Sequence, residues 1–207
     1  MGTKFRGSKT EQILINSFAG EAQARNRYTY YSKIAKKEGY EQVSEIFLMT
    51  AENELEHAKL FFKHIENNPN GHVDAFYPFL MGSTEQNLKF AIEGEEEEYK
   101  VLYLNGEKVA LDEGFDSVAS TFKHVRNAEE HHAKRFQLLY ENLKNDTIFK
   151  KETEQKWFCR KCGYIYVGEK APDYCPNCYH SKGYFQLLCE TFWFDENFIA
   201  QAVQIII

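Results

Sequence analysis

The sequence predicts an all-α four-helix bundle with one long crossover, followed by a small domain of strands and loops. Three observations lead to this prediction. Residues 9 to about 145 contain few glycines and have a helical pattern almost throughout. Within that stretch one pattern of residues occurs twice, 75 positions apart. From residue 157 onward the composition changes to aromatic, glycine, proline and cysteine residues, which indicates a second domain of a different kind.

Turn and capping residues divide the helical stretch into four long helices. They are expected at about residues 10–38, 41–66, 83–113 and 116–145. Gly39 separates the first pair of helices and Gly114 separates the second pair, so each half is expected to form an antiparallel hairpin. A longer segment at 67–82 joins the two halves, which is the connection expected in a bundle with one crossover.

The duplicated pattern contains Glu-x-x-His in both halves, at Glu54 and His57 and again at Glu129 and His132. A spacing of three residues places both side chains on one face of a helix. The candidates expected to point into the bundle are Glu21, Glu54, His57, Glu95, Glu98, Glu129 and His132. One Glu from each of two helices and Glu-x-x-His from each of the others form the ligand set of di-metal carboxylate bundles.

The alternative for each of these residues is a solvated helix face. A lone Glu-x-x-His and the run of four glutamates at 95–98 are each typical of charged surface. The two copies repeat in phase with their flanking apolar positions, however, and this favours a buried site. Burying so many carboxylates without cations would cost too much free energy. Since imidazole ligands suit iron better than magnesium or calcium, we expect a metal pair of that kind.

Two tyrosines follow the carboxylates of the first and third helices by about two helical turns. Tyr28 lies seven residues after Glu21, whereas Tyr103 lies eight residues after Glu95. We expect these tyrosines to hydrogen-bond the metal ligands or to pack in the core. The difference of one residue predicts a local irregularity, such as a π-bulge, in one of the two helices.

Four of the five cysteines form two Cys-x-x-Cys pairs. In a chain without an export signal these pairs favour a metal site over disulfides. Four thiolates, from Cys159, Cys162, Cys175 and Cys178, would give a tetrahedral site that fits either zinc or a single iron. The segment 157–190 is too short to bury a self-sufficient core, so bound metal is expected to stabilise it. Cys189 has no partner in the pattern and is interpreted as a packed or free thiol.

The predicted organisation is a helical domain at 1–145, a polar linker at 146–156, a cysteine-rich domain at 157–190 and an apolar tail at 191–207. The net charge of -6 argues against a nucleic-acid backbone as partner. No apolar run approaches the ~18 residues of a membrane-spanning helix, and the polar, basic N-terminus does not resemble a signal peptide. We therefore expect a cytoplasmic protein that binds neither nucleic acid nor membrane.

Taken together, these features resemble rubrerythrins, which join a ferritin-like di-iron domain to a C-terminal rubredoxin-like domain. The resemblance covers about residues 10–190 and rests on Gly-Glu-Ala-Gln-Ala-Arg-Asn-Arg-Tyr at 20–28, the two Glu-x-x-His motifs, Glu95-x-x-Glu98, Cys-x-x-Cys-Gly-Tyr and Cys-Pro-x-Cys. It implies two non-haem irons in the carboxylate–histidine cluster and one redox-active iron at the four cysteines.

The resemblance also implies a function, which is the reduction of hydrogen peroxide to water. Electrons would come from NAD(P)H through a separate reductase, or from a rubredoxin, and would enter through the cysteine-bound iron. In this family one iron moves between the positions matching Glu98, its ligand in the diferric form, and His57, its ligand in the diferrous form. A head-to-tail homodimer, or a larger assembly, and protection from oxidative stress in an anaerobe or microaerophile are implied as well.

Two other functions fit parts of the sequence. Iron oxidation and storage, as in a ferroxidase, would use the same bundle but would not need an attached one-electron iron site. A metal-binding interaction protein would carry zinc at its cysteines instead. The apolar tail at 191–207 departs from the family, whose chains usually stop soon after the cysteine module, and the sequence does not indicate its role.

Overall fold

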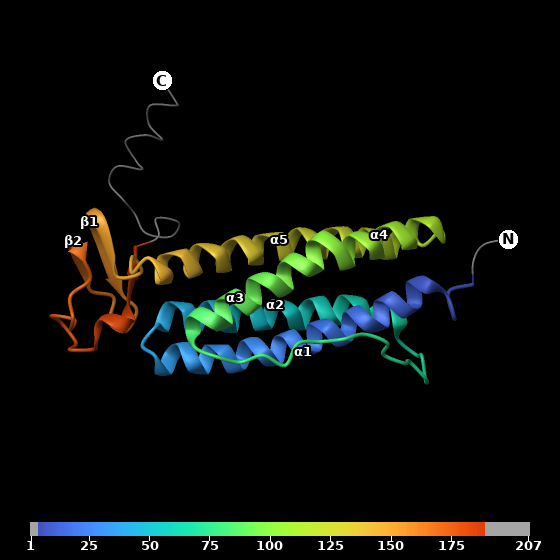
Figure 1. Ribbon diagram of the computed structural model, residues 1–207, viewed down its shortest axis with the longest axis horizontal. Helices are drawn as coiled ribbons and strands as arrows, with labels where there is room; N and C mark the ends of the chain where they lie inside the picture. Colours follow the sequence, from blue (N-terminus) through green and yellow to red (C-terminus); the bar gives the residue numbers. More distant parts are fainter. Residues whose placement is uncertain (1–3, 189–207) are drawn as a thin grey trace, which may run out of the picture. The chain divides into compact units, whose positions relative to one another are not determined.

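The computed structural model describes residues 4–188 (Figure 1). The chain divides into a helical unit and a smaller strand-containing unit, with the boundary between Asp146 and Thr147. The helical unit is a four-helix bundle with one long crossover, and the smaller unit contains a three-stranded sheet. This confirms the predicted fold class. Cys189 and the apolar tail at 191–207 lie outside the described residues.

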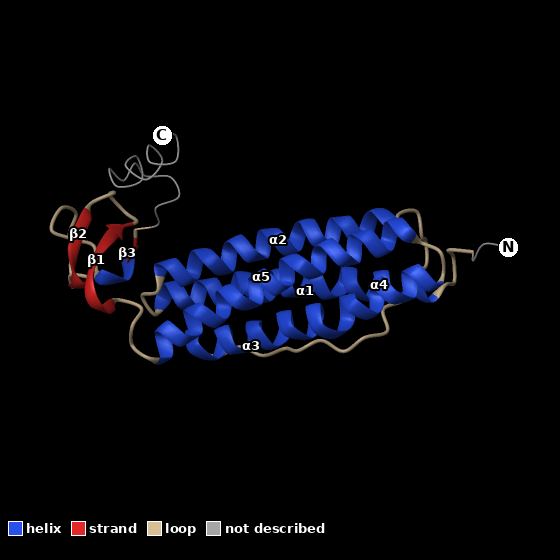
Figure 2. Ribbon diagram, turned by 90° about the horizontal axis from the view of Figure 1, so that it is seen from above, coloured by secondary structure: helices blue, strands red, loops and turns tan. Residues whose placement is uncertain are grey.

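The helical unit consists of two hairpins. Its elements are α1 (Lys9–Lys37), α2 (Glu41–Ile65), α3 (Thr84–Glu97), the π-helix η1 (Glu98–Leu102), α4 (Tyr103–Asp112) and α5 (Asp116–Lys144). Helix α1 packs on α2, while α3 and α4 pack on α5. Figure 2 shows the crossover between α2 and α3 running along the outside of the bundle. Helices α1 and α3 each begin with a serine cap, which is Ser8 for α1 and Ser83 for α3.

Each hairpin turns at a glycine in the left-handed conformation, with φ of 85° at Gly39 and 84° at Gly114. The residue after each glycine donates its backbone N–H to the last turn of the preceding helix. Tyr40 bonds the Ala35 carbonyl at 2.9 Å, and Phe115 bonds the Ala110 carbonyl at 2.8 Å. This is the Schellman closure of a helix C-terminus, in which glycine avoids the cost of a positive φ. The duplication therefore extends to the hairpin turns.

The predicted irregularity lies in the second half of the bundle. The π-helix η1 begins at Glu98, directly after the last residue of α3, and it inserts one extra residue into the helix that pairs with α5. The one-residue difference between the two tyrosine spacings is thereby accounted for, and the prediction is confirmed.

Two aromatic clusters lie on either side of the Glu-x-x-His layer. One contains Phe47 of α2 and Phe136 of α5, whose ring centroids are 5.2 Å apart; the other contains Phe61 and Phe122, at 5.0 Å. In sequence, Phe47 precedes the α2 motif and Phe61 follows it, and the corresponding order holds in α5. All four rings are fully buried. Apolar packing therefore closes both ends of the layer that carries the charged residues.

The smaller unit is an antiparallel sheet with strand order β2-β1-β3. Its elements are β1 (Lys150–Cys159), β2 (Ile165–Lys170), the 3-10 helix η2 (Lys182–Tyr184) and β3 (Phe185–Leu187). Its small core includes Trp157 and Phe185 together with two of the cysteines. The indole N–H of Trp157 donates to the Gly168 carbonyl at 2.8 Å, which fixes the ring across the β1–β2 pair.

The predicted linker at 146–156 is wrong over most of its length. Strand β1 begins at Lys150, where it pairs with Lys170, and the pairing resumes after an irregularity at Gln155 opposite Gly168. Residues 150–156 are nearly all polar and do not alternate with apolar residues, so the sequence carries no strand signal there. Lys150, Gln155 and Lys156 pair with β2, and residues 151–154 form the irregularity between these pairs.

Among residues 4–188, none of the helices combines the length and the apolar character that crossing a membrane requires.

We expect Gly106→Ala to destabilise the helical unit. A Cβ atom at Gly106 would lie 2.8 Å from the Phe122 ring, so the fully buried ring would have to move. Overpacking costs about 1–3 kcal/mol, against a helix-propensity gain of about 1 kcal/mol for Ala over Gly. Urea unfolding followed by circular dichroism at the helix band should show a lowered midpoint.

Gly94→Ala is the matched control, because its Cβ would meet the Arg27 guanidinium at an ordinary 3.8 Å. It should be neutral or slightly stabilising. Equal midpoints for the two variants would contradict the close packing of α4 on α5.

Candidate metal centres

Four carboxylates and two imidazoles converge in the middle of the bundle. They form two groups, Glu21, Glu54, His57 and Glu129 in one and Glu54, Glu95, Glu129 and His132 in the other. In each group the potential ligand atoms all lie within 4.8 Å of one another, and every residue is buried. Two carboxylates, Glu54 and Glu129, belong to both groups. The structure therefore brings six of the seven predicted residues together.

The shared carboxylates have the geometry of bridging ligands. Glu54 directs Oε2 to within 2.9 Å of His57 Nδ1 and Oε1 to within 3.3 Å of His132 Nδ1. Glu129 directs Oε1 to His57 Nδ1 and Oε2 to His132 Nδ1, each at 2.8 Å. Because the two motifs lie on facing helices α2 and α5, the imidazole rings stack with centroids 5.8 Å apart. Each bridging carboxylate thus presents one oxygen to each group.

The two tyrosines hold the non-bridging carboxylates from the opposite half of the bundle. Tyr28 of α1 donates to Glu95 of α3 at 2.5 Å, and Tyr103 of α4 donates to Glu21 of α1 at 2.5 Å. Both rings are buried. The sequence indicated that these tyrosines lie near the ligands, but the crossed pairing depends on how the hairpins face each other. Each hydrogen bond orients a carboxylate, as outer partners of metal ligands commonly do.

Negative charge dominates the cluster when no metal is bound. Burial, followed by the charges of Glu129 and Glu54, raises the pKa of Glu21 well above its usual range. Burial would lower the pKa of both histidines, but Glu129 and Glu54 oppose it and raise the pKa of His57 to about 10 and that of His132 to about 12. The cluster therefore attracts positive charge, whether as protons or as metal cations.

Several buried polar atoms of the cluster form no hydrogen bond among the described residues, although some of them lie at ion-pair distance from an imidazole nitrogen. They are Glu21 Oε2, Glu54 Oε1, Glu95 Oε2, Oε1 and Oε2 of Glu129, and His132 Nδ1. Unpartnered buried polar atoms are rare and costly, so an arrangement with this many requires an explanation. A cation in each group would satisfy them together, since carboxylate and imidazole donors in this mixture suit iron. The donor set is consistent with a di-iron site.

The seventh predicted residue, Glu98, lies outside both groups. It is the first residue of η1, and its buried side chain has no hydrogen bond or ion pair within the described part of the chain. His131, which precedes His132, is exposed and belongs to neither group.

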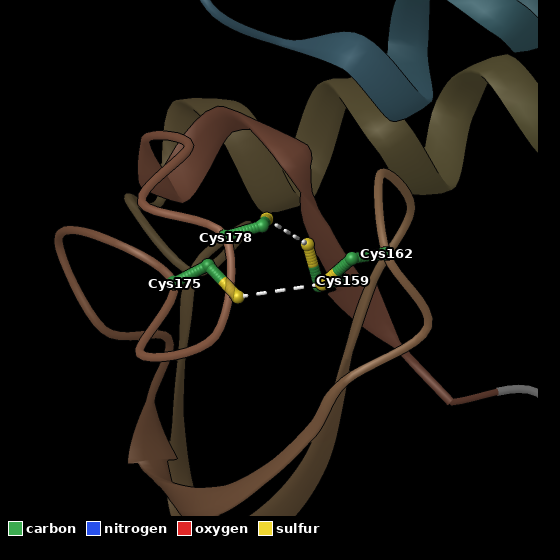
Figure 3. A group of neighbouring side chains, drawn as sticks. All are labelled: Cys159, Cys162, Cys175 and Cys178. Carbon is green, nitrogen blue, oxygen red and sulfur yellow. Dashed lines mark hydrogen bonds between the residues drawn. The ribbon is translucent and has the colours of Figure 1, made fainter.

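The four paired cysteines converge in the smaller unit (Figure 3). Their sulfurs lie within 4.8 Å of one another, with 3.8 Å between Cys159 and Cys178 and 3.7 Å between Cys162 and Cys175. All four are free thiols rather than disulfides. The two Cys-x-x-Cys turns share a hydrogen-bond pattern, in which the first cysteine of each pair donates its N–H, to the Tyr164 carbonyl and to the His180 carbonyl respectively, at 2.8 Å. This arrangement fits a tetrahedral metal site.

The thiols differ in acidity. A hydrogen bond from the Asn177 side chain, with one from the Tyr164 backbone, lowers the pKa of Cys162 to about 6. A backbone hydrogen bond at His180 acts in the same direction on Cys178, but burial and the neighbouring thiols raise the pKa of Cys178 to about 12. A metal ion would stabilise all four thiolates together. The effect of Asn177 on Cys162 was not predicted from the sequence. Asn177 occupies the variable position of the Cys-Pro-x-Cys motif, which was the only indication of its place beside the cysteines.

Comparison with known proteins identifies the family. A model of the rubrerythrin family matches residues 12–140, and a model of the rubrerythrin rubredoxin-like domain matches residues 157–186. The chain is 46% identical over 191 residues to Rubrerythrin-1 of Clostridium acetobutylicum, covering 90% of this chain and 98% of that protein. The chain belongs to the rubrerythrin family. It is also 43% identical over 183 residues to the rubrerythrin of Nitratidesulfovibrio vulgaris, covering 88% and 96% of the two chains.

Solved structures support the same assignment. Nigerythrin in a mixed-valence state superposes with a TM-score of 0.60 at 28% identity, covering 90% of this chain and 92% of nigerythrin. A Desulfovibrio desulfuricans bacterioferritin superposes with a TM-score of 0.61 at 17% identity, covering 67% of this chain and 82% of its own. The second likeness shows a ferritin-like fold, as expected for a rubrerythrin.

We expect Tyr103→Phe to weaken metal binding in the group that contains Glu21. The change removes the hydrogen bond that orients this carboxylate and keeps the buried ring. Loss of such an outer partner typically costs 10–100-fold in metal affinity. Anaerobic titration of the metal-free protein with Fe(II) should resolve one weakened site of the pair. Tyr140→Phe, on a ring that carries no ligand contact, should bind like the unaltered protein, and equal affinities in all three proteins would contradict the orienting role.

We expect Cys175→Ala to remove one metal ion per chain and to unfold the smaller unit selectively. Cys175 is fully buried, and the core around it is too small to be stable alone. Hydrogen exchange should become fast in β1 and β2 while α2 and α5 keep their protection. Cys189→Ala changes the fifth cysteine and serves as the control, with full metal content. Retention of slow exchange in β1 by Cys175→Ala would show that the sheet is stable without the metal.

Proposed function

We propose that this protein is a peroxidase that reduces hydrogen peroxide to water at a di-iron site. The observation that carries the proposal is the pair of four-ligand groups sharing two carboxylates inside a rubrerythrin-family bundle. In this proposal Glu21, Glu54, Glu95, Glu129 and His132 are metal ligands throughout, and the set is completed by Glu98 in the diferric form and by His57 in the diferrous form. When bound, the two irons supply the two electrons that cleave the O–O bond, and two protons complete the formation of two waters.

Other residues of the chain exclude water from the site, hold the carboxylates in place and complete the ligand set. The aromatic clusters around Phe47 and Phe61 exclude bulk water from the site, which strengthens its electrostatic interactions. Tyr28 and Tyr103 hold their protons on Oη and keep the carboxylates of Glu95 and Glu21 in place through the reaction. Glu98 and His57 are the catalytic residues in this proposal, because either one completes the ligand set of the same metal.

Electrons are proposed to arrive one at a time through a single iron bound by Cys159, Cys162, Cys175 and Cys178. This function requires a redox-active metal there, and a rubredoxin-like domain supports iron in preference to zinc. The proposed donor is an NAD(P)H-dependent reductase or a rubredoxin. A head-to-tail homodimer would bring the two kinds of site together between copies, and a cytoplasmic role in protection from oxidative stress completes the proposal.

Stopped-flow oxidation of the fully reduced protein tests the function. We expect hydrogen peroxide to oxidise the di-iron site much faster than dissolved oxygen does, and steady-state turnover to need the cysteine-bound iron. Glu98→Ala should keep both irons and lose most peroxide turnover, whereas Glu97→Ala, at the exposed neighbouring position, should keep it. A preference for oxygen would favour a ferroxidase, and zinc at the cysteines would exclude the proposed electron route.

A further inference from the structure

The carboxylate of Glu98 lies against a position of α1 that has no side chain. A Cβ atom placed at Gly20 would be 4.0 Å from Glu98 Oε1 and 3.5 Å from Cε1 of the Tyr77 ring. The Glu98 carboxylate from η1 and the Tyr77 ring from the crossover thus both lie next to the same glycine of α1. Gly20 directly precedes Glu21, so this contact lies beside the first metal group. We refer to Gly20, Tyr77 and Glu98 as the Gly20 contact.

Tyr77 is held at this place by hydrogen bonds between the crossover and α1. Its hydroxyl donates to the Asn16 carbonyl at 2.6 Å. The Asn16 side chain in turn accepts from the Asp74 N–H and donates to the Asp74 carbonyl, both at 2.9 Å. Gln12 donates to the His72 carbonyl at 2.8 Å, one turn earlier on the helix. The crossover is therefore tied to α1 on the side from which Tyr77 approaches Glu98.

Charged groups of both signs lie near the Gly20 contact. Burial and the negative charges of Glu95, Glu129 and Glu54 oppose the ionised form of Glu98, while the Arg27 guanidinium favours it. Arg27 lies close to α3, with Nη2 3.8 Å from a Cβ built at Gly94, and its Nε and Nη1 have no partner among the described residues.

We propose that the Gly20 contact is the resting place of the Glu98 carboxylate when it is off the metal pair. Gly20 provides the space and Tyr77 covers it from the crossover side. The two are positioning residues that set how readily Glu98 leaves and rejoins the metals. The inference rests on the proposed function, because it concerns the part that Glu98 takes there.

The position of the Glu98 carboxylate should raise or lower the reduction potential of the di-iron pair in a predictable direction. A carboxylate on the metals adds negative charge and stabilises the more highly charged, ferric state. Any change that disfavours the resting place therefore lowers the potential, and any change that favours it raises the potential. A tenfold change in the preference of Glu98 between its two positions corresponds to about 59 mV for a one-electron step.

Two substitutions act on the contact in opposite directions. Gly20→Val adds methyl groups beyond the Cβ position, in the direction of Glu98 Oε1, and should lower the potential. Tyr77→Ala removes the covering ring and admits water, which stabilises an ionised carboxylate off the metal, and should raise the potential. Redox titration of the iron-loaded proteins, followed by the electron paramagnetic resonance signal of the half-reduced pair, measures both shifts.

Gly20→Ala is the control, since its Cβ stays at ordinary contact distances and the potential should not change. Shifts of the same sign in Gly20→Val and Tyr77→Ala, or no shift in either, would overturn the inference. If Gly20→Val fails to bind two irons, the test depends on Tyr77→Ala alone. An unchanged or lowered reduction potential of Tyr77→Ala would then contradict the inference. None of these measurements uses peroxide, so the inference can fail while the proposed peroxidase activity stands, and the reverse also holds.

Discussion

The burial of carboxylates in the middle of the bundle is the constraint on which the rest of the structure depends. Glu21, Glu54, Glu95, Glu98 and Glu129 are all buried, and the effective cost of burying an ion is still several kcal/mol after relaxation. Two imidazoles, two tyrosine hydroxyls and the capacity for two cations offset that cost. Fully buried aromatic rings close both ends of the charged layer, so that charge is confined to one slab of an otherwise apolar core.

The internal duplication makes this arrangement nearly symmetric, and the departures from symmetry lie on one side. The bridging carboxylates, the histidines, the tyrosines and the glycine turns occur in equivalent pairs. The π-helix η1 and the carboxylate of Glu98 occur in the second half alone, and the crossover brings Tyr77 to the same place. A symmetric cage suits two equal metals, whereas a chemical step that treats them differently needs an asymmetric element. We propose Glu98 as that element.

The smaller unit is limited in a different way, because its core is too small to be stable alone. Two of its cysteines are part of the buried core and also potential metal ligands, so metal binding and folding are coupled. The polar start of β1 pairs with β2 at Lys150 and again from Gln155. The polar sequence has no alternating apolar pattern, so it did not indicate this strand, and the linker predicted at 146–156 was wrong. In the rubrerythrin family such a unit accompanies the helical one, which supports a redox part for the metal.

The sequence was sufficient to predict the four helices, their glycine turns, the six converging glutamate and histidine residues, the four paired cysteines and the existence of a helical irregularity. These features depend on local spacing, because residues three apart, on a helix or in a Cys-x-x-Cys turn, lie close together whatever surrounds them. The tertiary structure was needed to show which carboxylates belong to both groups, which tyrosine bonds which glutamate, and that Glu98 and Tyr77 both lie next to Gly20. Those contacts join segments far apart in the chain, and their geometry follows from how two hairpins and a crossover pack together.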